Sequence, residues 1–302
     1  MNRRQALAAC AAFPLAACAT RLNTHETEPS DLGTPVNQAA LLDAMTRPGA
    51  VRFEKIVAAD WHFPHGVRTE EAGEWTFRQL EAQIYFYAVR HPTRGLYLID
   101  AGMPADYAVH MGPLLRRVVA RDYELQLRLA TERWTAAHGA PRAVFVTHLH
   151  YDHVLGVAAL SRDIPVYLGP GDGGHRSFFY RFINQPTREA LAGRAVRAWR
   201  FATPAAGELA MLDVFGDGAV FALHVPGHTP GSTAYLVNAA DGPQLVTGDA
   251  VHSREAWTGE LIEANGFEAD LPQVHASLAA LQALAARIPG VVVHPGHQSL
   301  AP

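Results

Sequence analysis

Thr147-His148-Leu149-His150-Tyr151-Asp152-His153 is the stretch of this 302-residue chain that decides its fold and its chemistry. An apolar run at 143–146, which predicts a strand, leads straight into it, and an apolar helical start follows. In an extended segment His148 and His150 point to the same side, so both can bind one metal ion. The turn at Asp152 and His153 directs the next two side chains toward a second ion.

Three more residues of the kinds that bind metals stand just after predicted strands farther along the chain. They are His228 in Pro-Gly-His-Thr-Pro-Gly, Asp249 in Thr-Gly-Asp-Ala and His297 in Pro-Gly-His-Gln. All candidate ligands thus lie on the turns after four strands, as a shared sheet edge requires. The sequence therefore predicts one centre built by four turns.

The residue types limit which metals and which kind of site are possible. Both cysteines, Cys10 and Cys18, lie in the N-terminal leader, so the folded part offers no thiolate ligand. Histidine and carboxylate together suit zinc, and the candidates outnumber the four ligands of a closed structural site. A catalytic centre is therefore favoured, in which two metals lower the pKa of bound water and make it a nucleophile.

Short apolar runs alternate with helical stretches from Val51 onward, which predicts a layered α/β fold. The predicted strands are 84–89, 96–99, 143–146, 166–168, 219–223, 233–237, 244–246 and 291–293. One helix is predicted over 271–288, where Pro289 and Gly290 end the periodic pattern, and another over 124–138.

The order and context of these motifs resemble the metallo-β-lactamase superfamily, and the resemblance runs from Val51 to the C-terminus. It implies a four-layered αβ/βα sandwich with a site for two zinc ions (Zn2+) at one edge of its paired sheets. One zinc would be held by His148, His150 and His228, the other by Asp152, His153 and His297, and Asp249 would bridge them. Asp152 could also orient the nucleophile, which would make it a catalytic residue as well as a ligand.

Two branches of the superfamily that hydrolyse carbonyl compounds fit the motifs. The stretch from Leu98 to Gly102 and the bridging Asp249 resemble lactone hydrolases, whereas cysteine-free β-lactamases have serine at the bridging position. A lactone or ester is therefore the favoured small-molecule substrate, and a β-lactam is the alternative. Many lactonases place a tyrosine three residues after the bridging aspartate, but this chain has His252, which is a candidate catalytic residue or a simple turn cap.

Other readings of the same centre remain open. Glutathione thioester hydrolases carry a helical region after the last histidine, whereas this sequence has five residues beyond His297, which counts against them. Iron-dependent persulfide dioxygenases share the leading motif, so iron is an alternative to zinc. A periplasmic metal-binding module without catalysis is the non-enzyme alternative.

Several residues around the motifs need separate interpretation. His294 competes with His297 as last ligand, but His297 follows the strand end more directly, and His224 within a strand is expected to be a core histidine. Two segments could border the substrate, and the first of them could equally be core or dimer surface. They are the aromatic and helical stretch Phe178-Phe-Tyr-Arg-Phe182 with 187–199, and the rim Trp61, His62, Phe63 and His65.

The N-terminus is typical of an exported lipoprotein. Arg3 and Arg4, a short apolar stretch and Leu15-Ala-Ala-Cys18 predict a signal peptide over 1–17, with a possible twin-arginine route, and a lipid on Cys18. We expect a flexible tether over 18–50, a hydrolase domain over 51–302, and a location on the periplasmic face of a bacterial membrane, with the outer membrane as one candidate. Loss of the leader shifts the formal charge from −4 to −6, which does not favour nucleic acid as a partner.

Overall fold

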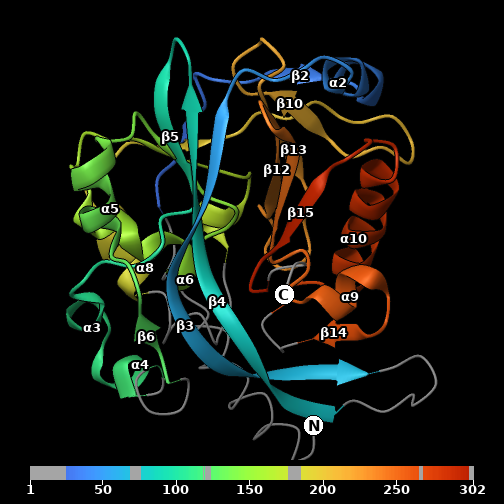
Figure 1. The fold of residues 1–302 in the computed structure, drawn as a ribbon. Coiled ribbons are helices and arrows are strands. Elements are labelled where there is room, and N and C mark those ends of the chain that lie inside the picture. The colour runs from blue at the N-terminus through green and yellow to red at the C-terminus, as the bar shows by residue number, and fades with distance from the viewer. Residues whose placement is uncertain are drawn as a thin grey trace, which may run out of the picture.

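The computed structural model describes residues 25–68, 76–117, 119, 124–175, 185–264 and 268–298. Two β-sheets pack face to face, and helices cover their outer faces, so that four layers form an αβ/βα sandwich (Figure 1). The predicted fold class is confirmed.

The first sheet has nine strands within the described residues, in the order β1-β9-β8-β7-β5-β4-β3-β14, with β6 paired to β3. Strands β5, β7, β8 and β9 run parallel, and β3, β4 and β5 form an antiparallel meander. The strands are β1 Glu28–Pro29, β3 Arg52–Arg68, β4 Thr76–His91, β5 Gly95–Ile99, β6 Gln126–Leu127, β7 Val144–Phe145, β8 Val166–Leu168, β9 Val196–Ala198 and β14 Ile262–Ala264.

The second sheet has the order β15-β13-β12-β11-β10-β2. All of its pairings are antiparallel except the parallel pair of β13 with β15. The strands are β2 Thr34–Val36, β10 Met211–Asp213, β11 Val220–His224, β12 Thr233–Ala239, β13 Gly242–Gly248 and β15 Val292–Pro295.

The helices lie outside the two sheets, with α10 on the second sheet and α5 and α8 on the side of the first (Figure 1). The α-helices are α2 Gln38–Met45, α3 Tyr107–His110, α4 Pro113–Arg117, α5 Thr131–His138, α6 Tyr151–Val154, α8 Gln185–Leu191, α9 Arg254–Thr258 and α10 Leu271–Ala285, with 3-10 turns η2 Leu155–Ala159 and η3 Asp172–Gly174. Asp270 begins α10 by accepting a hydrogen bond from the N–H of Gln273. Within the described part of the chain, no helix has the length and apolar character needed to cross a bilayer.

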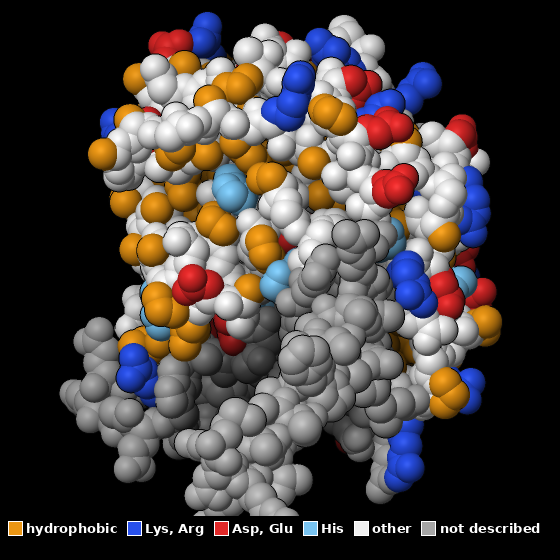
Figure 2. All heavy atoms as spheres, turned by 180° about the vertical axis from the view of Figure 1, so that it is seen from behind, with side chains coloured by type: hydrophobic (Ala, Val, Ile, Leu, Met, Phe, Trp, Pro, Cys, Tyr) orange, Lys and Arg blue, Asp and Glu red, His pale blue; other side chains and the backbone are white. Residues whose placement is uncertain are grey.

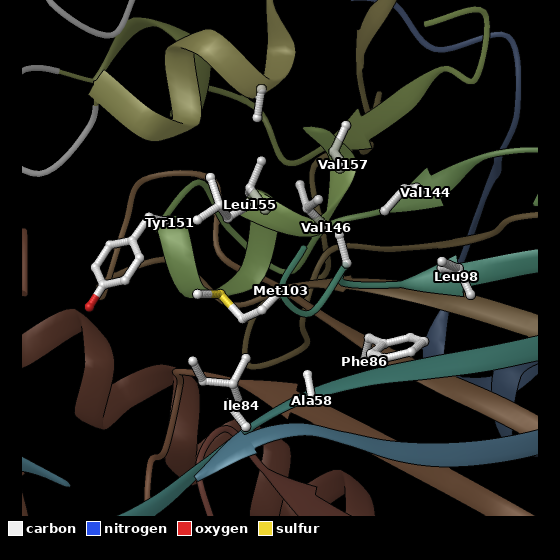
Figure 3. Packing of buried hydrophobic residues seen from close by; sticks show 14 of the residues in the cluster. Ala58, Ile84, Phe86, Leu98, Met103, Val144, Val146, Tyr151, Leu155 and Val157 are labelled. Carbon is white, nitrogen blue, oxygen red and sulfur yellow. The ribbon is translucent and has the colours of Figure 1, made fainter. Parts of the chain in front are cut away.

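Three apolar clusters hold the layers together. Between the sheets, Tyr87 and Phe145 of the first sheet pack with Tyr235 of the second. Outside the first sheet, Met103 is fully buried and lies between Ile84 of β4 and Leu155 of η2 (Figure 3). The third cluster joins α2 and α10 to the second sheet. Burial on both faces explains why the central strands appear in the sequence as continuous apolar runs.

Two sequence predictions about local structure are wrong. The helix predicted over 124–138 exists only as α5, because Gln126 and Leu127 form β6 and pair with β3. The prediction of a tether up to residue 50 is wrong from residue 25 onward. Strand β1 pairs with β9 in the first sheet, β2 pairs with β10 in the second, and the fully buried Leu41 of α2 packs into the third cluster. Long-range pairing and apolar contact outweigh the polar local composition.

Candidate metal centre

The seven candidate ligands lie together at one end of the sandwich, on the loops that follow β7, β11, β13 and β15. Strand β7 ends at Phe145, and His150 immediately precedes α6, so a short extended segment carries the first two histidines and a helical turn carries the next pair. All seven side chains belong to residues that are at most 8% exposed.

The ligand atoms form two groups, and within each group they lie within 4.8 Å of one another. The first, here called the three-histidine group, is His148, His150, His228 and Asp249. The second, the two-histidine group, is Asp152, His153, Asp249 and His297. The structure thus brings together the same two sets that the sequence predicted, with Asp249 common to both.

Asp249 is the midpoint of the centre. Its Oδ2 lies 3.4 Å from Nε2 of His228 and 3.3 Å from Nε2 of His297, and its Oδ1 lies 3.3 Å from Nε2 of His153. Burial alone would raise the pKa of this carboxyl, but the imidazoles of His297 and His153 outweigh it and hold the pKa well below the usual value. Asp249 is therefore ionised and faces both groups.

The donor set fits two divalent cations. Nε2 of His148, Nε2 of His153 and Oδ1 of Asp249 are buried and have no hydrogen-bond partner among the described residues. Burial, reinforced by the neighbouring imidazoles, lowers the pKa of His148 and His150 well below its usual value, so both are neutral, the form that binds a metal. Burial also lowers the pKa of His228 to about 4. Buried polar atoms without partners that face one another are what a metal ion would satisfy.

Contacts on the far side of the histidine rings orient these ligands. Oδ2 of Asp100 lies 2.8 Å from Nδ1 of His153, and Oδ1 accepts a hydrogen bond from the backbone N–H of Thr147. Nδ1 of His297 lies 3.0 Å from the carbonyl oxygen of Gln83. Such contacts fix which ring nitrogen faces the metal. Asp100 lies in the stretch from Leu98 to Gly102 that resembles lactone hydrolases, but its contact with a ligand was not predicted from the sequence.

His252 faces the centre from the loop after β13. Its Nε2 lies 3.4 Å from Oδ2 of Asp249, and its ring is parallel to that of His297 at 5.8 Å. On the other side, Oε2 of Glu263 accepts a hydrogen bond from the backbone N–H of His252 and lies 3.4 Å from its Nδ1. Burial lowers the pKa of His252, but Asp249 and Glu263 outweigh it and raise the pKa well above the usual value. The role of Glu263 was not predicted from the sequence.

The other singled-out histidines lie outside both groups. Nε2 of His294 contacts Oε1 of Gln244 at 2.9 Å, and Nε2 of His224 contacts the carbonyl oxygen of Pro230 at 2.9 Å. His224 is thus a satisfied histidine, as expected. Trp61 borders the centre, with its ring 5.4 Å from that of His297.

The remaining rim predictions are only partly covered by the structure. His62 lies beside Glu124, at 4.0 Å, in a half-exposed position. The side chains of Phe63 and His65 and the segment 178–182 lie outside the described residues. The stretch 187–199 is not one helix, because α8 ends at Leu191 and β9 follows.

Two cavities flank the centre. One, of about 660 Å³, is lined by Trp61, Arg128, Arg254 and His297, among others. The other, of about 270 Å³, is lined by His252, Ile262 and Leu278 among others. The two cavities therefore border the centre beside His297 and beside His252.

An αβ/βα sandwich whose edge loops carry two buried histidine–aspartate groups defines a class, the metal-dependent hydrolases of this fold. The family model of the metallo-beta-lactamase superfamily matches residues 81–297. The chain belongs to this superfamily.

Individual relatives fall into two groups. A hydroxyacylglutathione hydrolase of Pseudomonas paraeruginosa is 37% identical over 161 residues, which are 51% of this chain and 48% of that protein, so the match spans about half of the relative's length. The N-acyl homoserine lactonase AttM of Azorhizobium caulinodans is 26% identical over 241 residues, 72% of this chain and 82% of that protein. A solved quorum-quenching N-acyl homoserine lactone lactonase superposes with a TM-score of 0.61 at 17% identity, covering 83% of this chain and 94% of its own, which supports the fold.

Proposed function

We propose that this protein is a zinc-dependent hydrolase that opens a lactone or cleaves an ester. The observation that carries the proposal is the pair of buried ligand groups that share Asp249, with His252 facing the same carboxylate. The lactonase relative, which aligns over most of both chains, supports the choice of bond.

The chain's own residues have distinct tasks in this reaction. When bound, two zinc ions would supply an activated water nucleophile and polarise the scissile carbonyl. The three-histidine group would hold one of them and the two-histidine group the other, and Asp249 belongs to both groups. Asp152, whose Oδ2 lies 3.4 Å from Nε2 of His297, accepts a hydrogen bond from the attacking water and orients it.

His252 takes the place of the tyrosine found in many lactonases. Its Nε2 is directed at the centre because Glu263 holds the opposite side of the residue. A ring N–H in this place can donate a hydrogen bond to the substrate oxygen as negative charge develops on it. His252 is therefore a catalytic residue in the proposed mechanism.

A thioester of glutathione is the second candidate substrate. The cavity beside His297 carries two guanidinium groups, from Arg128 and Arg254, and Arg128 is paired with Asp60. Guanidinium groups suit the carboxylates of a glutathione moiety. The identity to hydroxyacylglutathione hydrolases over half of the chain favours the same candidate.

The test combines metal analysis with a panel of substrates. The leader-free protein is assayed for zinc and iron and is given a lactone, a simple ester, a glutathione thioester and a β-lactam, with and without chelator. We expect about two zinc ions per chain and chelator-sensitive lactone or ester hydrolysis, lost in Asp152→Asn but kept in the exposed control Asp241→Asn. Faster thioester hydrolysis would favour the second candidate. One iron per chain without hydrolysis of any substrate would refute the proposal.

We also propose that the chain acts outside the cytoplasm, on the periplasmic face of a membrane, and is anchored through a lipid on Cys18. Arg3, Arg4 and the small residues before Cys18 support this, and they lie outside the described residues. On the face shown in Figure 2, acidic and basic side chains are interspersed, which supports a small-molecule substrate over nucleic acid. Metabolic labelling with palmitate should mark the wild type and not Cys18→Ser.

A further inference from the structure

A buried carboxylate outside both ligand groups connects two loops of the centre. Asp172 is the first residue of η3, after β8, and is 2% exposed. Its Oδ2 accepts a hydrogen bond from the backbone N–H of Leu149 at 3.1 Å, and its Oδ1 accepts one from the backbone N–H of Gly231 at 2.7 Å. Each carboxylate oxygen thus holds a different loop.

Both loops carry histidines of the three-histidine group. Leu149 stands between His148 and His150, and Gly231 closes the turn that begins at His228. The N–H groups that Asp172 holds are therefore in the backbone that carries all three histidines. Among the described residues, Asp172 has no hydrogen bond to a member of the two-histidine group.

The segment that carries Asp172 approaches the loop of Gly231 very closely. A Cβ on Gly231 would lie 2.8 Å from the carboxyl carbon of Asp172, and one on Gly169 would lie 1.7 Å from the carbonyl oxygen of Gly231. Burial raises the pKa of Asp172 to about 6, although hydrogen bonds from Thr229 and from the two backbone N–H groups act against the rise. Burial of the Asp172 carboxylate therefore costs desolvation free energy, which its hydrogen bonds offset in part.

We propose that Asp172, which follows β8, is a positioning residue for the three-histidine group alone. The inference rests on the proposed metal centre. Asp100, which follows β5, differs from it, because Asp100 contacts His153 and also accepts hydrogen bonds from Thr147, whose Oγ1 lies 3.1 Å from Nδ1 of His148. Asp100 therefore supports both groups.

The substitution Asp172→Asn tests the two hydrogen bonds of Asp172 with little change in the shape of the side chain. In Asp172→Asn one backbone N–H keeps an oxygen acceptor, but the other meets the side-chain NH₂, so one loop is released. Loss of such an outer contact lowers metal affinity by about 10- to 100-fold. In Asp172→Asn we expect one of two zinc equivalents to bind that much more weakly and the other to bind as in the wild type.

The experiment titrates metal-free protein with Zn²⁺ by calorimetry and repeats the titration with Co²⁺, whose absorption spectrum reports the ligands of each position. Asp100→Asn should weaken both equivalents, because Asp100 contacts His153 directly and His148 through Thr147. Asp241→Asn, on the exposed turn between β12 and β13, should weaken neither. If Asp172→Asn does not fold, Asp172→Ser, which retains an oxygen acceptor without charge, replaces it.

The outcomes separate this inference from the proposed function. Two equivalents in the wild type and one selectively weakened in Asp172→Asn support the inference. Equal weakening of both equivalents, or of neither, overturns it and leaves the proposed hydrolase intact. A wild type that takes up no metal overturns both.

Discussion

Removal of the His252 side chain is the sharpest test of how this centre differs from one with tyrosine in that place. In His252→Ala the protein keeps all seven candidate ligands, because His252 belongs to neither ligand group. We therefore expect the zinc content to stay at the wild-type value. The substrate oxygen, however, loses the donor that Nε2 would provide.

The size of the effect follows from the surroundings of the ring. His252 is 3% exposed and is held between Asp249 and Glu263, so the donor is in place before the substrate arrives. Removing one such donor from a buried site typically lowers kcat by about 10²- to 10³-fold, or about 3–4 kcal/mol of transition-state stabilisation. Glu263→Gln keeps an acceptor oxygen but removes the charge, and should lower kcat by about tenfold.

Steady-state kinetics on the preferred substrate, with metal content measured on the same samples, checks these values. An interaction made only in the transition state lowers kcat and kcat/KM equally. His275→Ala is the matched control, because His275 lines the same cavity from α10. A His252→Ala enzyme with full zinc content and a kcat within about threefold of the wild type would refute the catalytic role.

Three further predictions concern stability. Burial, assisted by a nearby lysine, lowers the pKa of His294 from 6.5 to about 3, so the unfolded chain takes up this proton first as the pH falls below 6.5. Between about pH 8 and pH 5 this residue should account for about 2 kcal/mol of lost stability, and urea titrations should show that much less loss in His294→Gln than in the wild type. A Cβ on Gly156 would lie 1.9 Å from a backbone carbonyl oxygen, so Gly156→Ala should give little folded protein, whereas Gly174→Ala, with nothing within 4 Å, should purify normally. Tyr235→Phe removes the hydroxyl that accepts a hydrogen bond from Nε1 of Trp199 and should cost about 1–3 kcal/mol in chemical denaturation; an unchanged midpoint would contradict this.

The sequence was sufficient for the centre because the information there is local. Four of the seven candidate ligands stand within residues 148–153, and the other three each follow an apolar strand. Strands buried on both faces appear as continuous apolar runs, which is why β8 was predicted with its observed bounds. The position of a candidate ligand next to a strand end can thus be predicted from the sequence.

The outer contacts could not be predicted because they join distant parts of the chain through the backbone. Asp172 binds N–H groups 23 and 59 residues away, and any residue type can supply an N–H. A single aspartate in a glycine-rich turn carries no local signal of such a role. In the same way, α2 has only Leu41 and Ala44 as buried residues within a polar context, so its packing onto the second sheet was missed.

The same outer contacts link folding to metal binding. A buried atom without a hydrogen bond, such as Nε2 of His148, costs about 1–3 kcal/mol, which is a large share of the roughly 5–15 kcal/mol that stabilises a typical domain. The loops cannot relax to reduce this cost, because Asp172 and Asp100 fix them to the ends of core strands. A metal ion that satisfies the unpartnered atoms would therefore stabilise the fold as well as the reaction, and its removal by chelator should lower the midpoint of thermal unfolding.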